Sequence, residues 1–148
     1  MNHKQKGNEG EARAATYLEA QGVRILETNY RFHKLGEIDL IGSEQCPDET
    51  GIVLPGAGID VHDRKRKQSA TGLLHTYLVF IEVKYRKSAE KGLALEAVSY
   101  AKQRQICRVA NAYMMEHSIA ADTRIRFDVV AIDGEKVTWM KNAFEFID

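Results

Sequence analysis

Asp39, Glu82 and Lys84 are the residues of this 148-residue chain whose types and spacing best suit metal-assisted chemistry. Glu82 and Lys84 lie two positions apart in an apolar run that predicts a strand, so both project from one face. A Glu or Lys buried in a sheet is costly unless it is paired or binds a metal. If the strand that contains Asp39 pairs with this one, the two carboxylates point to one place. Oxygen ligands of this kind suit Mg²⁺, with Mn²⁺ as an alternative, and the ion takes further contacts from water and a substrate phosphate.

The same residues also have a simpler interpretation. Glu82 and Lys84 would form a salt bridge at a strand end and Asp39 would be an exposed edge residue, since an Asp followed at a distance by Glu-x-Lys is a common pattern. The context favours the metal site, because Gly36 allows a close backbone approach and a further carboxylate, Glu11, is expected on the opening helix. There Lys84 would orient or help to deprotonate the attacking water, or stabilise charge that develops on phosphorus.

The hydrophobic pattern predicts the elements that must position these residues. Asn8 and Glu11 resemble a capping box, so a first helix is expected at about residues 9–21. A central strand with two apolar faces is expected at residues 77–85, and a long amphipathic helix at residues 95–114. Further strands are expected at residues 23–26, 37–42, 124–132 and 136–140.

This order of helix, three strands, helix and two strands (αβββαββ) predicts an α/β sandwich with a central mixed β-sheet flanked by helices. The length fits a single domain over residues 1–148. Residues 43–76 contain both prolines and the cationic run 64–67, and no period is sustained there. The segment is interpreted as an irregular insertion, with a short extended piece at residues 51–54.

The formal net charge is zero, with 21 basic and 21 acidic residues, which argues against a nucleic-acid binder held by bulk charge. The charges are unevenly distributed, however. Residues 37–63 contain seven acidic and no basic residues, whereas residues 64–108 contain eleven basic and three acidic ones. A metal site that acts on a polyanion needs such a pair of blocks, although solvated surface that pairs with itself would have the same composition.

Several cations are candidates for contacts with a nucleic-acid backbone. They are Arg86, Lys87 and Lys91 after the Glu-x-Lys pair, and Arg64 and Lys65 in the insertion. The run at 64–67 would equally serve to keep a loop soluble.

Other charged residues have a structural interpretation. Three cations of the long helix could also contact phosphates, but a solvated helix face is the favoured interpretation; they are Lys102, Arg104 and Arg108. Arg126 and Asp128 share a strand face and are expected to pair either with each other or with the site, and a structural role is favoured.

The two cysteines, Cys46 and Cys107, lack the spacing of zinc ligands and could form at most one disulfide. Residues 1–11 are polar, and the apolar stretches after them are only strand-sized, so neither a signal peptide nor a membrane span is expected. We therefore expect a cytoplasmic protein.

In combination, the motifs resemble a known family. Asp39 and Glu82-Val83-Lys84 look like the active-site pattern of the PD-(D/E)XK restriction-endonuclease-like superfamily. The chain is similar over nearly its whole length to the YraN family, small bacterial proteins taken to be endonucleases from their likeness to archaeal Holliday junction resolvases. The motifs that carry this similarity are Gly10-Glu11-Ala12, Asn29-Tyr30-Arg31, Gly36-Glu37-Ile38-Asp39-Leu40-Ile41, Phe80-Ile81-Glu82-Val83-Lys84, Tyr85-Arg86 and Arg126-Phe127-Asp128-Val129-Val130.

The resemblance implies a restriction-endonuclease-like fold and a Mg²⁺-dependent endodeoxyribonuclease, a hydrolase that cuts phosphodiester bonds in branched or otherwise structured DNA. It assigns catalysis to Glu11, Asp39, Glu82 and Lys84, with the three carboxylates as metal ligands. Junction cutting would imply a homodimer with two sites. The alternative is a non-catalytic DNA-binding or partner-recruiting module that keeps the nuclease fold. Family members usually join the Asp strand to the Glu-x-Lys strand by a short hairpin, so the insertion at 43–76 leaves the substrate preference open.

Overall fold

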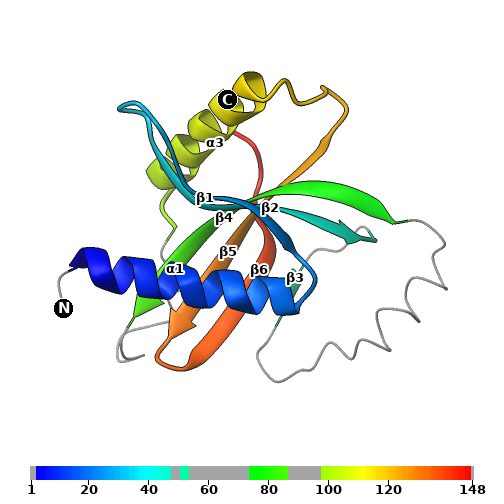
Figure 1. Ribbon diagram of the computed structural model, residues 1–148. Coiled ribbons are helices and arrows are strands. Elements are labelled where there is room, and N and C mark those ends of the chain that lie inside the picture. The colour runs from blue at the N-terminus through cyan, green and yellow to red at the C-terminus, as the bar shows by residue number, and fades with distance from the viewer. Residues whose placement is uncertain (1–2, 48–50, 54–73, 87–97, 148) are drawn as a thin grey trace.

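The computed structural model describes residues 3–47, 51–53, 74–86 and 98–147, arranged as one mixed sheet with a helix on each face (Figure 1). The elements in chain order are α1 (His3–Ala20), β1 (Arg24–Phe32), β2 (Gly36–Cys46), β3 (Gly51–Val53), β4 (His75–Arg86), α3 (Tyr100–Glu116), β5 (Arg124–Asp133) and β6 (Lys136–Phe144).

The sheet has six strands in the order β1-β2-β4-β5-β6-β3. β4 and β5 are parallel, and the other neighbouring strands are antiparallel. The parallel pair requires a crossover connection, and this connection contains α3. The structure therefore confirms the expected mixed sheet flanked by helices and the order αβββαββ, to which it adds the three-residue edge strand β3.

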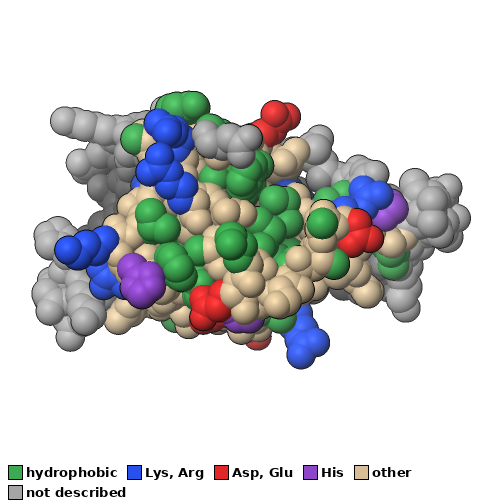
Figure 2. Space-filling model, turned by 90° about the horizontal axis from the view of Figure 1, so that it is seen from above, with side chains coloured by type: hydrophobic (Ala, Val, Ile, Leu, Met, Phe, Trp, Pro, Cys, Tyr) green, Lys and Arg blue, Asp and Glu red, His purple; other side chains and the backbone are tan. Residues whose placement is uncertain are grey.

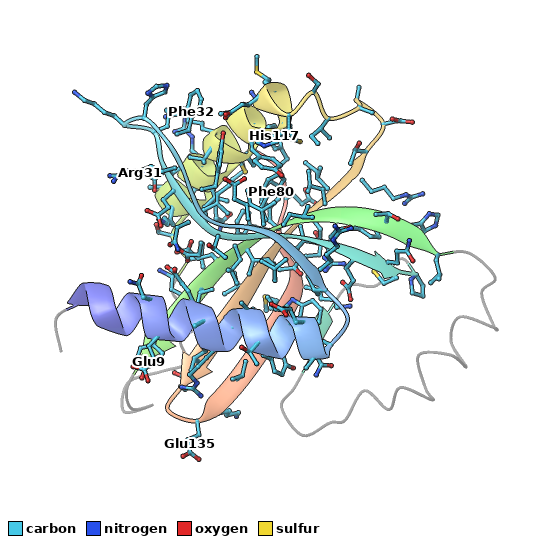
Figure 3. All side chains as sticks on the ribbon, in the orientation of Figure 1. Glu9, Arg31, Phe32, Phe80, His117 and Glu135 are labelled. Carbon is cyan, nitrogen blue, oxygen red and sulfur yellow. The ribbon has the colours of Figure 1, made fainter. Side chains whose placement is uncertain are left out.

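The two faces of the sheet are covered by different helices. α1 lies across β4, β5 and β6, and its Ala14 and Leu18 pack on a cluster that includes Trp139 (Figure 1). On the opposite face α3 packs through residues such as Tyr113 against Phe80, with ring centroids 5.9 Å apart. Figure 3 labels Phe80 on this side of the sheet, next to α3. Because β4 contributes buried residues to both clusters, it has the two apolar faces that its sequence predicts.

Several predicted boundaries are wrong. α1 begins at His3, so Asn8 lies inside the helix and does not cap it; a longer helix with a small apolar stripe packs against the sheet instead. β1 continues to Phe32, well past residue 26, because it pairs with β2 up to the pair of Phe32 with Gly36. The long helix begins at Tyr100 after the N-cap Ser99, and residues 95–97 lie outside the described residues.

The insertion is shorter than the predicted 43–76. Residues 43–46 and 75–76 belong to the β2–β4 ladder, which extends to the pair of Cys46 with His75. The extended piece expected at residues 51–54 is confirmed as β3, which pairs with β6 at the sheet edge. The cationic run at 64–67 lies outside the described residues.

Candidate metal centre

The candidate site begins where β2 and β4 separate. Their ladder ends at the pair of Leu40 with Ile81, after which β2 pairs only with β1 and β4 only with β5. Asp39 is the next residue on β2, and its Oδ2 accepts a hydrogen bond of 2.8 Å from the backbone N–H of Val83. The carboxylate thus takes the place of a ladder carbonyl in the fork between the two strands.

Glu82 lies beside this fork, and only 6% of its surface is exposed. Burial and the neighbouring Asp39 carboxylate raise the pKa of Glu82 from 4.5 to about 7, although two lysines favour the ionised form. Lys84 Nζ and Lys102 Nζ lie 3.7 and 3.9 Å from the same oxygen, Glu82 Oε1. Lys84 follows on β4, whereas Lys102 comes from the first turn of α3. The two ammonium groups therefore offset only part of the cost of ionising Glu82.

A third carboxylate reaches the site from α1. Gly10 allows this helix to lie directly on β4, since a Cβ at residue 10 would be 3.1 Å from the Cβ of Tyr85. The next residue is Glu11, whose Oε2 is buried and has no hydrogen-bond partner among the described residues. Burial and the negative charge of Asp39 raise the pKa of Glu11 to about 7, while a hydrogen bond from Asn29 favours the ionised form.

A fourth carboxylate, Glu37, was not predicted as a site residue. Ligand oxygens of Glu11, Glu37 and Asp39 lie within 4.8 Å of one another. Glu37 and Asp39 are two positions apart on β2, so the same alternation that relates Glu82 to Lys84 could have identified Glu37.

This arrangement fits a divalent cation bound through oxygen. Crowded carboxylates with raised pKa values become fully ionised when a dication removes their mutual repulsion. The unpartnered Oε2 of Glu11 offers a ligand atom, and hard oxygen donors suit Mg²⁺ or Mn²⁺. Glu11, Glu37 and Asp39 place their oxygens close enough to hold one ion, whereas the predicted ligand Glu82 is not in this group and adjoins it through Asp39.

The predicted residues fall into two groups. The structure brings the predicted catalytic set together, namely Glu11, Asp39, Glu82 and Lys84. The predicted nucleic-acid contacts cannot be placed in the same way. Arg86 ends β4 but its side chain lies outside the described residues, as do Lys87, Lys91, Arg64 and Lys65.

Lys102 requires a correction. Its interpretation as part of a solvated helix face is wrong, because it lies 3.9 Å from Glu82. The spacing of charges along the helix contains no signal for this contact. It depends on where α3 begins relative to the end of β4, which only the folded chain determines.

A second group of charges, buried in the sheet away from the candidate site, forms an ion cluster. Arg126 donates through Nε and Nη2 to the two carboxylate oxygens of Asp128 at 2.8 Å, which confirms the predicted pair. Glu44 on β2 accepts from Arg126 at 2.6 Å and from Lys141 at 2.9 Å. Burial opposes ionisation of Glu44, but Lys141 and Arg126 hold its pKa below the ordinary value. Trp139 Nε1 also donates to Asp128, at 2.9 Å. Partners satisfy these charges internally, so we assign them to stability.

Among the described residues no helix is long and apolar enough to cross a membrane. Cys46 and Cys107 are both buried free thiols.

Comparison with known proteins identifies relatives over the whole chain. The sequence model of the uncharacterised protein family UPF0102 matches residues 10–132. A UPF0102 protein of Lachnoclostridium phytofermentans is 37% identical over 145 residues, which cover 98% of this chain and 97% of the relative. A UPF0102 protein of Shewanella loihica is 37% identical with 96% of each chain covered, and one of Legionella pneumophila is 34% identical with 95% of each covered.

Proposed function

The chain belongs to the uncharacterised protein family UPF0102, and we propose from the candidate metal centre that it is a metal-dependent DNA endonuclease that hydrolyses phosphodiester bonds. One observation carries the proposal. Carboxylates from α1 and β2 lie within 4.8 Å of one another, Glu82 on β4 interacts with one of them, Asp39, and the pKa values of Glu11 and Glu82 are raised to about 7. In a structural ion pair the pKa of the carboxylate is lowered instead. Glu44 in the buried ion cluster is an example, because its paired cations lower its pKa.

Each residue has a role in this proposal. Glu11, Glu37 and Asp39 would hold Mg²⁺ or Mn²⁺, and a backbone N–H of β4 fixes the orientation of the Asp39 carboxylate. When bound, the ion supplies Lewis-acid stabilisation of the phosphate oxygens and lowers the pKa of the attacking water. Lys84, about a quarter exposed, lies beside Glu82 where its ammonium group can orient that water and stabilise negative charge on the phosphate.

The finer assignment is also part of the proposal. The order αβββαββ and the separation of the Asp strand from the Glu-x-Lys strand at the site support a place in the PD-(D/E)XK superfamily, within the YraN family. By that resemblance the substrate is branched or structured DNA, the protein acts in the cytoplasm, and a homodimer supplies two sites to a junction.

The test is cleavage of linear, nicked, flapped and four-way DNA with Mg²⁺ or Mn²⁺, followed on gels. Asp39→Asn is the most informative variant, because an amide oxygen can still accept from the Val83 N–H while the ligand charge is lost. We expect this variant and Lys84→Ala to lose at least about a hundredfold in cleavage rate. Glu135→Gln, which changes an exposed carboxylate on the turn between β5 and β6, is the matched control and should keep the wild-type rate (Figure 3).

Two results would count against catalysis. If wild-type protein cuts none of these substrates but binds them, the alternative of a non-catalytic DNA-binding module is correct. If cleavage persists in Asp39→Asn, the activity comes from a contaminant or from another site.

A further inference from the structure

Two adjoining grooves run along the exposed side of α3, facing the turn between β1 and β2. The first has a volume of 510 Å³, and its lining includes the cations Lys34, Lys102, Arg104 and Arg108. The second has a volume of 620 Å³ and is mainly apolar, with Phe32 and Met115 in its lining. Leu35 and Arg108 line both grooves, so the two form one continuous surface.

The surface is built from two elements that are held close together. Gly36 at the start of β2 has φ +137°, a conformation that L side chains rarely adopt. A Cβ at this position would lie 2.6 Å from Nε2 of Gln105 on α3. The glycine therefore lets the turn at residues 33–35 approach the helix, and this approach forms the wall of the grooves.

Three of the four cations of the first groove are not neutralised within the described part of the chain. Lys34, Arg104 and Arg108 form no ion pair with another described residue. Lys102, at the same groove, lies 3.9 Å from Glu82 and so connects the groove with the candidate metal centre. Such a row of uncompensated cations beside a phosphoryl-transfer site suits successive phosphates of one strand.

The second groove offers apolar contact surface next to these cations. Met115 is 74% exposed and Leu35 38% exposed. Glu116 contributes to the lining, but its carboxylate already accepts a hydrogen bond of 2.5 Å from the hydroxyl of Tyr30. Figure 2 shows this end of the molecule, where hydrophobic side chains gather in the middle of the face and Lys and Arg side chains lie at its margins. Apolar and aromatic side chains beside a basic groove are the usual means of binding unstacked bases.

We propose that the two grooves bind one unpaired nucleic-acid strand. Its phosphates contact Lys34, Arg104 and Arg108, and its bases lie against Phe32, Leu35 and Met115. The inference rests on the proposed function, because Lys102 lies both at the groove and beside Glu82, so a strand bound in the groove continues to the candidate metal centre. A continuous duplex keeps its base faces stacked inside and cannot present them to the apolar groove. The favoured substrate therefore has a single-stranded segment next to the position of cleavage.

The test is fluorescence anisotropy with labelled oligonucleotides of one length, in EDTA so that no cleavage occurs. The probes are a single strand, the same strand with abasic positions, and the corresponding duplex. Wild-type protein should bind the single strand at least about fivefold more tightly than the duplex or the abasic strand. Arg104→Glu/Arg108→Glu should weaken binding of the single strand more than tenfold and lower the slope of log Kd against log salt by about 1 to 2.

Matched variants outside the grooves control for charge and polarity. Arg24→Glu changes an exposed cation at the other end of β1, and Leu26→Glu introduces a charge at a half-exposed apolar residue. Both should bind as wild type does. Met115→Glu should remove the difference between the intact and abasic strands, while the exposed position keeps the fold intact.

The inference is overturned if the duplex binds as tightly as the single strand, or if Arg104→Glu/Arg108→Glu weakens binding no more than Arg24→Glu does. It is also overturned if Met115→Glu leaves oligonucleotide binding unchanged but changes the molecular mass measured by light scattering. The apolar groove would then be a contact between copies of the chain. These outcomes are separable from the fate of the proposed function. Binding as described without any cleavage refutes only the endonuclease, whereas cleavage with wild-type KM in Arg104→Glu/Arg108→Glu refutes only the grooves.

Discussion

Glu82 combines two properties that rarely occur together. Two ammonium groups lie within 4 Å of its carboxylate, and yet its pKa is raised to about 7. Burial and the adjacent Asp39 charge thus outweigh both cations. A group in this state is costly to ionise in the metal-free protein, and the cost has a definite pH dependence.

We predict that Glu82→Gln stabilises the metal-free protein at pH 8 but not at pH 4. Since the folded pKa of about 7 lies above the ordinary 4.5, the folded protein binds this proton more tightly than the unfolded chain. Wild-type stability from this group is therefore complete below pH 4.5 and is lost as the pH rises through about 7. The amide mimics the protonated acid at every pH, so the gain at pH 8 should be on the order of 1–2 kcal/mol. Urea unfolding in EDTA measures it.

The control is the variant Glu135→Gln at an exposed position, whose effect on the free energy of unfolding should be the same at pH 4 and pH 8. Equal effects of Glu82→Gln at pH 4 and pH 8 would show that the carboxyl group ionises normally and that a central premise of the metal site is wrong.

At the scale of elements, β2 connects the candidate site with the buried ion cluster. Glu37 and Asp39 lie at its start, and Glu44 lies near its end with 1% of its surface exposed. The cluster joins β2 to β5 and β6 through Arg126 and Lys141, and so it fixes the strand that presents Asp39.

We predict that Lys141→Met lowers the free energy of unfolding by about 3–5 kcal/mol, because it leaves Glu44 buried with one cation instead of two. The methionine can still pack on Trp139, over whose ring the lysine Nζ now lies at 4.5 Å. Lys136→Met, at an exposed position of the same strand, should change stability by less than about 0.5 kcal/mol. Chemical denaturation of both variants gives the comparison.

The double variant Glu44→Gln/Lys141→Met sharpens this test, since it removes the charge that the single variant leaves without its lysine partner. It should be more stable than Lys141→Met alone. A double variant less stable than the single one would show that the Lys141 charge, rather than the unbalanced Glu44, accounts for the loss.

The sequence indicates those contacts that depend on strand periodicity. Pairing of an Asp strand with a Glu-x-Lys strand predicts that Asp39 and Glu82 meet, and the alternation along β4 predicts the neighbouring Lys84. Contacts that depend on how a helix packs against the sheet cannot be predicted from strand periodicity. Lys102 lies beside Glu82, and Gln105 lies beside Gly36. Both contacts depend on where α3 begins, at Tyr100, and on where it packs against the sheet.

At the scale of the whole molecule, the net charge is zero, but acidic and basic side chains are separated in space. Four carboxylates lie together where β2 starts and β4 ends, and the cationic groove adjoins them. The insertion leaves the sheet at the opposite end of the β2–β4 ladder, seven residues or roughly 23 Å from Asp39. The sequence could not show this distance, because the predicted boundaries placed the insertion directly after residue 42.

Replacement of residues 47–74 by an Asn-Gly turn tests what the insertion does. Cys46 and His75 are direct partners in the ladder, so a two-residue turn can join them, and the removed segment has four basic and four acidic residues. Loss of the short strand β3 should cost no more than about 2 kcal/mol, since it contributes few hydrogen bonds.

We predict that this shortened chain cleaves DNA with an unchanged kcat, because the insertion leaves the sheet far from Asp39. Its Kd for DNA should rise about three- to tenfold, since Arg64 and Lys65 are removed while the net charge stays at zero. Single-turnover cleavage and anisotropy titrations measure the two quantities separately, and circular dichroism checks the fold. A folded protein with a reduced kcat would place the insertion at the catalytic site, whereas an unchanged Kd would remove Arg64 and Lys65 from the DNA contacts.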